Sequence, residues 1–403
     1  MKTYLEEQFI KTVQILPDKY LSCGGRFEVL GNHTDHNHGL CIAATCDLAI
    51  YAAVKAREDK LVRFLSEGFG YSEIDLSNLE KVEDEIGKPA ALIRGIANYL
   101  VTNEYQIKGF DIYLKSNVPS GAGVSSSAAF ELLIAQVFNV LFNESKIELI
   151  TLCQAGQFAE REFYGKMCGL LDQIGVAYGG LVYIDFKDIT NIDIKSLAPD
   201  LSNYQFVIVN SGGSHAELSH LYKEIPDDMY NVANVFGKNF LIDVSYDDFK
   251  KNKADVIEKC GKRAYQRAKH FYDENKRVQD AYKAISKNNI EKLIKLINES
   301  RKSSTELLEN MCVDGKVKGS PLEACNLIMK ASHKKAGVKI NGGGFAGSVI
   351  ALVPKKELKN VVEAVKEKYG KENVHIVNVR NDILRSLGCW TRYCSGSSGW
   401  RIM

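Results

Sequence analysis

An α+β fold in two domains is predicted from the mixture of strand-like and helix-like segments, the chain length and the lack of a repeat. Segments rich in branched and aromatic residues, typical of buried strands, alternate with helical stretches. At 403 residues the chain is long enough for two domains of ordinary size. Because neither a fixed-period repeat nor a long Pro/Gly/Ser linker occurs, we expect the two domains to pack closely around a ligand pocket.

The first domain is expected over residues 1–195. Its helices are predicted at 126–142, which is apolar on most faces and so belongs in the core, and at 147–163, which continues in helical period. Its buried strands are predicted at 40–56 (LCIAATCDLAIYAAVKA), 109–115 (GFDIYLK) and 179–186 (GGLVYIDF). Strands and helices together give this domain its α+β character.

The second domain is expected over residues 196–385. It opens with a strand at 205–211 (QFVIVNS) and continues through a Lys-rich helical region from about 228 to 308, whose lysines we assign to solvated helix faces. The unit that suits a ferredoxin-like layer comprises a strand at 349–354, a helix at 355–370 and a strand at 374–379. Residues 386–403 are expected to form a tail that is disordered or outside the functional core.

Composition excludes several classes of partner. The net charge is only +2, so bulk electrostatics favour neither nucleic acid nor an anionic membrane. The first residues, MKTYLEEQFIK, carry acids where a secretion signal needs an apolar core, and no segment approaches the ~18 apolar residues of a membrane span. Ten cysteines without CxxC spacing indicate buried, reduced thiols. We expect a cytoplasmic protein; its oligomeric state is left open, a monomer included.

Residues 118–129 read VPSGAGVSSSAA and lie between a predicted strand and the apolar helix. Gly121 and Gly123 allow a tight turn that exposes backbone N–H groups, and the positive end of the helix dipole would stabilise a polyphosphate. The serines add hydroxyl donors and an oxygen ligand for Mg²⁺. The loop is not a Walker A sequence, and a serine-capped helix after a glycine turn is the alternative interpretation. The whole succession favours a phosphate-binding loop.

Residues 24–39 (GGRFEVLGNHTDHNHG) concentrate polar side chains between apolar, strand-like segments. Such a cluster is costly to bury unless it is hydrogen-bonded, and a polyhydroxylated sugar supplies donors and acceptors at matching density. The polar side chains are Arg26, Glu28, Asn32, His33, Asp35, His36 and His38. The histidines also suggest zinc, but the mixture of acids and amides lacks a recognised ligand spacing. The pattern therefore favours a sugar-binding loop.

Asp172 lies in MCGLLDQIGVAYGG, just before an apolar, glycine-rich stretch. Taken alone, an aspartate in such a place is more often a helix cap than a catalyst. A catalytic interpretation of Asp172 therefore depends on the motifs around it.

Three segments together resemble the signature motifs of the GHMP small-molecule kinases, and of the galactokinases within that family. GRFEVLGNHTDHNHG resembles the sugar signature, VPSGAGVSSSAA the phosphate loop, and KINGGGFAGSVIALV (339–353) the third, glycine-rich motif. The resemblance extends through AEREFYGKMCGLLDQ (159–173) and NSGGSHAELSHLY (210–222), and so covers nearly the whole chain in the family order. It implies a GHMP-kinase-like fold, with the active site in a cleft between a mixed-sheet N-terminal domain and a ferredoxin-like C-terminal domain.

The resemblance also implies ATP- and Mg²⁺-dependent phosphorylation of the anomeric hydroxyl of galactose. Asp172 would accept the hydroxyl proton, and Arg26 would hold Asp172 ionised and stabilise the developing charge. Gly342 to Gly344 would close over the substrates. The implied sugar contacts are Asn32, His33, Thr34, Asp35, Gly169 and Tyr222; the nucleotide contacts are Gly121, Ala122, Gly123, Val124, Ser125, Ser126 and Ser127; the Mg²⁺ ligands are Ser127 and Glu160.

Departures from the family pattern leave the substrate open. The family acid before the histidine is Asn32 here, and the tyrosine after the aspartate is His36. An amide removes repulsion toward a negative C6 group and adds a donor, so galacturonate is an alternative to galactose, as are other hexoses and amino-hexoses. Equally, Asn32 could bind the C6 hydroxyl of galactose. The arginines that commonly follow the tyrosine are absent after Tyr222, and no tryptophan stands near residue 89, so nucleotide preference is open with ATP as the default.

Two further interpretations compete. A catalytically silent sugar sensor on the same fold would not require the full set of Arg26, Asp172, Glu160 and the serine run. Mevalonate or homoserine kinases share the family, but the polar HTD segment favours a sugar over an apolar chain.

Overall fold

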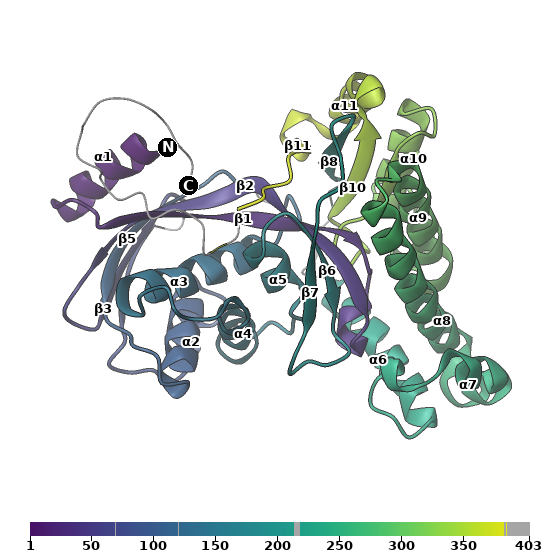
Figure 1. The fold of residues 1–403 in the computed structure, drawn as a ribbon, viewed down its shortest axis with the longest axis horizontal. Coiled ribbons are helices and arrows are strands. Elements are labelled where there is room, and N and C mark those ends of the chain that lie inside the picture. Colours follow the sequence, from purple (N-terminus) through teal and green to yellow (C-terminus); the bar gives the residue numbers. More distant parts are fainter. Residues whose placement is uncertain (69, 120, 213–217, 383, 385–403) are drawn as a thin grey trace.

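Strands β1 (Lys19–Leu30) and β2 (Leu40–Ala56) form a long antiparallel ribbon from which the rest of the larger sheet extends (Figure 1). The computed structural model describes residues 1–403 except 69, 120, 213–217, 383 and 385–403. β2 has the predicted bounds. β2 is apolar along its length because it lies inside the sheet. It pairs with β1 along one edge and with β5 and β6 along the other.

Within the described residues the larger sheet has seven strands, in the order β4-β3-β5-β2-β6-β7 with β1 paired to β2. β3 and β5 are parallel and the remaining pairs are antiparallel, so the expected mixed sheet is confirmed. The predicted strands at 109–115 and 179–186 correspond to β5 and β6. The other strands are β3 (Leu61–Ser66), β4 (Gly70–Asp75), β5 (Phe110–Ser116), β6 (Leu181–Asp185) and β7 (Asp193–Leu197).

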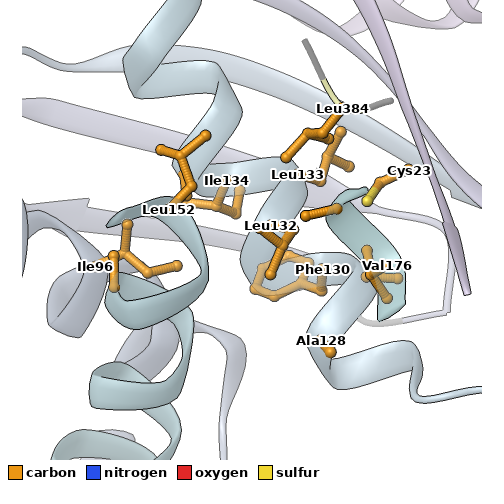
Figure 2. Close-up of a cluster of buried hydrophobic side chains, with 14 of the residues drawn as sticks. Cys23, Ile96, Ala128, Phe130, Leu132, Leu133, Ile134, Leu152, Val176 and Leu384 are labelled. Carbon is orange, nitrogen blue, oxygen red and sulfur yellow. The ribbon is translucent and has the colours of Figure 1, made fainter. Parts of the chain in front are cut away.

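Helix α3 (Ser126–Phe142) is the centre of the core beneath this sheet and has the predicted bounds. It is apolar on most faces because the sheet covers one side and neighbouring helices cover the others; Figure 2 shows Phe130, Leu132 and Ile134 among side chains from these neighbours. The neighbours are α2 (Pro89–Thr102), α4 (Leu149–Phe158) and α5 (Leu171–Ala177), while α1 (Lys2–Val13) packs on the opposite face (Figure 1).

The second half of the chain forms a smaller antiparallel sheet. Four strands of the described chain pair in the order β11-β8-β10-β9. With the helices between β8 and β9 and between β10 and β11, this is the β-α-β-β-α-β pattern typical of ferredoxin-like layers. The strands are β8 (Tyr204–Asn210), β9 (Gly337–Ile340), β10 (Ser348–Pro354) and β11 (Val374–Val377).

The helical region expected from about 228 to 308 is not continuous. It breaks after α6 and again between α8 and α9, and α8 is kinked at Gly261, whose φ of 88° and ψ of 162° are not helical. The helices are α6 (Ser219–Val235), α7 (Tyr246–Lys251), α8 (Lys253–Ser286), α9 (Ile290–Ser303), α10 (Pro321–Ala331) and α11 (Lys355–Tyr369). The described residues include no helix with the length and apolar composition needed to cross a bilayer.

Strand β1 connects the two halves of the molecule. Cys23 packs in the core beneath the larger sheet, whereas Phe27 packs in a second hydrophobic cluster that includes Phe206 of β8 and Leu293 of α9. The register between β1 and β2 shifts between Gly24 and Arg26, and such a bulge re-aims the side chains that follow it. As a result Arg26 faces α5, while its neighbour Phe27 faces the second half.

A buried ion pair also joins β1 to the second half of the chain. Lys339 of β9 donates from Nζ to Oε1 of Glu28 of β1 at 2.5 Å, and the two side chains are 0% and 4% exposed. The predicted domain boundary at 195/196 falls within β7, two residues before its end at Leu197, and stays a prediction. The predicted tail at 386–403 lies outside the described residues.

Candidate active site

Arg26 of β1 and Asp172 of α5 form the central ion pair of the site. Nε and Nη2 of Arg26 both lie 2.7 Å from Oδ1 of Asp172. Nη1 of Arg26 donates to the carbonyl oxygen of Gly123 at 3.0 Å. One guanidinium therefore joins the aspartate to the glycine-serine loop, with two of its nitrogens on a single carboxylate oxygen.

Asp172 is in the first turn of α5, but it does not cap the helix. The N-cap position is Leu170, and the Asp172 carboxylate instead accepts hydrogen bonds from Arg26 and from Oγ of Ser125, the latter at 2.5 Å. Burial alone would raise the pKa of Asp172, but the charge of Arg26 and these hydrogen bonds outweigh burial and lower it. Asp172 is therefore an ionised acceptor at neutral pH.

The start of α3 has the features of an anion site rather than of a serine-capped helix. Ser125, the N-cap residue, has φ 53° and makes no side-chain capping hydrogen bond, because its hydroxyl is committed to Asp172. The first-turn amides of α3 therefore receive no bond from this cap, as suits a helix that binds phosphate. Gly123 must be glycine, since φ is +71° and a Cβ there would lie 1.9 Å from Oγ of Ser348.

Asn341, which sequence patterns did not single out, fixes this loop from the second half of the chain. Its Nδ2 donates to the carbonyl oxygen of Gly123 at 2.9 Å, and its Oδ1 accepts the N–H of Glu28 at 3.0 Å. The glycine-serine loop, β1 and the third motif are thus held together by one side chain. The signal in the sequence was an asparagine directly before the three glycines at 342–344.

Ser127 and Glu160 lie together and fit a divalent cation. Oγ of Ser127 donates to Oε1 of Glu160 at 3.2 Å, and both are hard oxygen ligands of the kind Mg²⁺ prefers. Glu160 is 1% exposed and lies in a π-helical turn, Ala159–Tyr164. Among the described residues no group of three or more His, Cys, Asp or Glu side chains is arranged to hold a metal. A cation here would therefore take further ligands from a nucleotide and water.

Asp35 and Gly169 face each other beside the central ion pair. A Cβ at Gly169 would lie 2.0 Å from Oδ2 of Asp35, so only glycine lets the carboxylate sit there. Burial, together with the charges of Asp172 and Glu28, raises the pKa of Asp35 to about 7. Two carboxyl groups with different pKa values thus stand at one site.

His33 and His36 form a directed chain of hydrogen bonds. Nε2 of His33 lies 2.7 Å from the carbonyl oxygen of Gly343 and must carry its hydrogen. Nδ1 of His33 then accepts from Nε2 of His36 at 3.3 Å, and Nδ1 of His36 accepts from Asn37 at 3.0 Å. This chain suits two neutral rings, and burial lowers the pKa of His33 to about 4 and that of His36 well below its ordinary value. His36 therefore orients His33.

Asn32 and Thr34 are bonded within the protein. Asn32 is fully buried; its Nδ2 donates to the carbonyl oxygen of Gly342 at 2.8 Å, and its Oδ1 accepts from Asn310 at 2.9 Å. Oγ1 of Thr34 lies 2.8 Å from the carbonyl oxygens of Gly31 and Leu40. In this conformation these two side chains shape the loop.

Tyr222 of α6 packs against the third, glycine-rich motif. Its hydroxyl donates to the carbonyl oxygen of Gly344 at 2.6 Å, and a Cβ at Gly343 would lie 2.0 Å from the Tyr222 ring. Burial raises the pKa of Tyr222, so the hydroxyl stays protonated as a donor. The structure thus brings the expected catalytic, sugar, nucleotide and metal residues to one place, from both halves of the chain.

Comparisons with known proteins point in one direction. Residues 91–180 match the GHMP kinases N terminal domain, and residues 7–56 match the galactokinase galactose-binding signature. The chain is 30% identical to a galactokinase of Clostridium tetani over 91% of this chain and 92% of that protein. It is 31% identical to a galactokinase of Glaesserella parasuis over 86% of this chain and 88% of that protein.

Solved structures give the same result for the fold. The galactokinase of Lactococcus lactis, complexed with galactose, superposes with a TM-score of 0.81 at 26% identity, covering 94% of this chain and 98% of that one. The mevalonate kinase of Methanococcus jannaschii superposes with a TM-score of 0.61 at 17% identity, covering 90% and 98% of the two chains. The second likeness concerns the fold alone.

Proposed function

This chain belongs to the galactokinase family, and we propose on that basis that it transfers the γ-phosphoryl group of ATP to the anomeric hydroxyl of galactose. The observation that carries the proposal is the position of Arg26, which bonds to Asp172 and to the glycine-serine loop at once. A proton acceptor is thereby held next to a site built for phosphate. Phosphoryl transfer depends mainly on such positioning and on charge stabilisation.

In this proposal Asp172 accepts the proton of the attacking hydroxyl. Its lowered pKa keeps it ionised, and Arg26 stabilises the negative charge that develops as the phosphoryl group moves. Ser125, which donates to the same carboxylate, fixes its second oxygen. Asp35 and Gly169 then border the position of the neighbouring sugar hydroxyls.

The nucleotide is assigned to residues 121–127 and the first turn of α3. The uncapped helix start and the turn at Gly123 supply backbone donors for the phosphates. Ser127 and Glu160 would hold Mg²⁺, which neutralises charge on the β- and γ-phosphate oxygens when bound.

Galactose is favoured over galacturonate by the surroundings of Asn32. An uncommitted amide could have bound a uronic carboxylate, but the Asn32 amide already donates to Gly342 and accepts from Asn310. Its N–H also faces Glu28, at 3.5 Å from Oε2, so the amide donors of Asn32 already have acceptors within the protein. The Asn32 substitution is therefore explained by contacts within the protein.

Release of ADP by the purified protein with ATP, Mg²⁺ and a panel of hexoses and uronic acids tests the substrate. Galactose should turn over; an inert galactose with active galacturonate would refute this assignment. Asp172→Asn should lose at least about 100-fold in kcat, because a positioned base contributes about 10²–10⁴-fold, and should retain sugar binding by calorimetry. Full turnover in this variant would remove Asp172 from the base role.

A silent sugar sensor would not need an ionised Asp172 held by Arg26 beside the Ser127–Glu160 pair, so we favour an enzyme. We further propose a cytoplasmic location, which suits both the use of ATP and the eight described cysteines, all of which are free.

A further inference from the structure

Lys166 places an ammonium group on the candidate metal ligand. Its Nζ lies 2.6 Å from Oε1 of Glu160, and this is the same oxygen that accepts the hydrogen bond from Ser127. A divalent cation bound between Ser127 and Glu160 would need that oxygen as well. Lysine and metal therefore compete for one atom.

The local backbone explains how Lys166 reaches Glu160. The π-helical turn ends at Gly165, which has φ 88°, and the N–H of Lys166 donates to the carbonyl oxygen of Glu160 at 2.9 Å. The Lys166 side chain is 56% exposed, whereas that of Glu160 is 2% exposed. The carboxylate is thus fixed in the protein, while the ammonium lies at the end of a flexible stem open to solvent.

The carboxyl groups around Glu160 favour a cation at this position. Glu131 is its buried neighbour, and Nε2 of Gln173 bridges the two carboxyl groups, at 2.9 Å from Glu131 and 3.3 Å from Glu160. Oε1 of Glu131 has no hydrogen-bond partner in the described chain, and burial followed by the charge of Glu160 raises the pKa of Glu131. The charge of Lys166 acts against this repulsion, and it also helps to keep Asp172 ionised.

We propose that Lys166 is an exchangeable counter-ion, which holds Glu160 before the nucleotide binds and moves onto the phosphate oxygens of ATP when a divalent cation takes its place. The inference rests on the proposed function. A positive charge remains at Glu160 throughout the exchange, and the displaced ammonium becomes a donor to a phosphate whose charge is redistributed during transfer. Lys166 is in this way a further catalytic residue, which couples metal binding to phosphate binding.

Lys166→Met tests the exchange, because it keeps the length of the side chain and removes the charge. Binding of Mn²⁺ alone to the nucleotide-free protein, followed by electron paramagnetic resonance, should become about 10-fold tighter, since the competing ammonium is gone. Binding of Mg-ATP, followed by calorimetry, should become about 10-fold weaker, with a lower kcat. Lys166→Arg should return the affinities for Mn²⁺ and for Mg-ATP most of the way to those of the unmodified protein. Lys146→Met, at an exposed pair with Glu144, is the matched control and should change neither.

The opposite signs separate this role from a structural one, which would weaken both ligands together. Mn²⁺ binding that is unchanged or weaker in Lys166→Met overturns the proposal, and so does unchanged binding of Mg-ATP. If the unmodified protein binds Mn²⁺ and Mg-ATP but does not phosphorylate galactose, the proposed function fails, while the two binding measurements still decide the role of Lys166.

Discussion

Replacing Arg26 with methionine should both slow turnover and change how the protein responds to pH. The substitution removes two contacts of 2.7 Å to Asp172 and one of 3.0 Å to Gly123, and it keeps much of the apolar stem. Loss of one preorganised electrostatic group costs about 10²–10³ in kcat. We expect kcat to fall by at least that factor, because Arg26 also holds the base.

The stability change can be worked from burial. Removing one partner of a buried ion pair costs about 3–5 kcal/mol, and Asp172, with 30% of its side chain exposed, is partly solvated. We therefore expect a loss of about 2–3 kcal/mol in the free energy of unfolding. Because the pKa of Asp172 is lowered in the folded protein, its contribution is present above its ordinary pKa and is lost as pH falls through the folded value. The difference in free energy of unfolding between the unmodified protein and Arg26→Met should therefore narrow in acid.

The assay is a pH profile of kcat at saturating galactose by ADP release, combined with urea unfolding at several pH values. Saturation keeps the pH dependence expected of sugar binding through Asp35 from setting the acid limb. In Arg26→Met the acid limb of the profile should move to higher pH, since the pKa of Asp172 is no longer lowered by the guanidinium. Arg63→Met is the control, because Arg63 is 44% exposed and meets Glu73 at 3.5 Å, and it should cost less than about 1 kcal/mol. An acid limb that does not move would refute the assignment of Asp172 and Arg26 as a coupled pair.

Asp35 should make sugar binding depend on pH: with its pKa raised to about 7 by burial and by neighbouring carboxylates, affinity for galactose should fall as the carboxyl is protonated below that pH. Calorimetric titrations across this range should show the dependence in the unmodified protein and lose it in Asp35→Asn, and a flat profile in both would contradict it. Lys339→Met should lower the free energy of unfolding by about 3–5 kcal/mol, because Glu28 is left buried without its partner. In urea unfolding, adding Glu28→Gln to this variant should recover part of the lost stability. If Lys339→Met alone were as stable as the unmodified protein, Lys339 and Glu28 would not form a stabilising ion pair.

The parts of the fold that the sequence predicted best are those whose environment is uniform. β2 and α3 were predicted to the residue, because both are apolar along their whole length and flanked by clear breaks. β1 was not predicted as a strand over Lys19–Leu30, since Arg26 and Glu28 interrupt its apolar pattern. Arg26 and Glu28 can be buried because they form ion pairs with Asp172 and Lys339, and partners so distant in the chain cannot be predicted from local sequence.

The site shows the same limit. Short motifs predicted which loops meet, but they did not predict how each side chain points. The contact of Asn32 with the sugar stays a prediction, and the local sequence did not indicate that its amide is bonded to Asn310 and Gly342, about 280 and 310 residues further along the chain. Lys166 resembled any solvated lysine until the π-helical turn placed it on Glu160. Tertiary partners, rather than propensity, decided both.

The change in side-chain direction along β1 has a consequence for the cooperativity of unfolding. Before the register shift its side chains fill the core around α3, and after it they fill the cluster shared with β8 and α9. A fragment that ended near residue 195 would thus leave Phe27 and Val29 exposed to water. A fragment that began there would lack the β1 side chains against which Phe206 packs. We expect neither fragment to hold its native shape, and the intact chain to melt in a single transition.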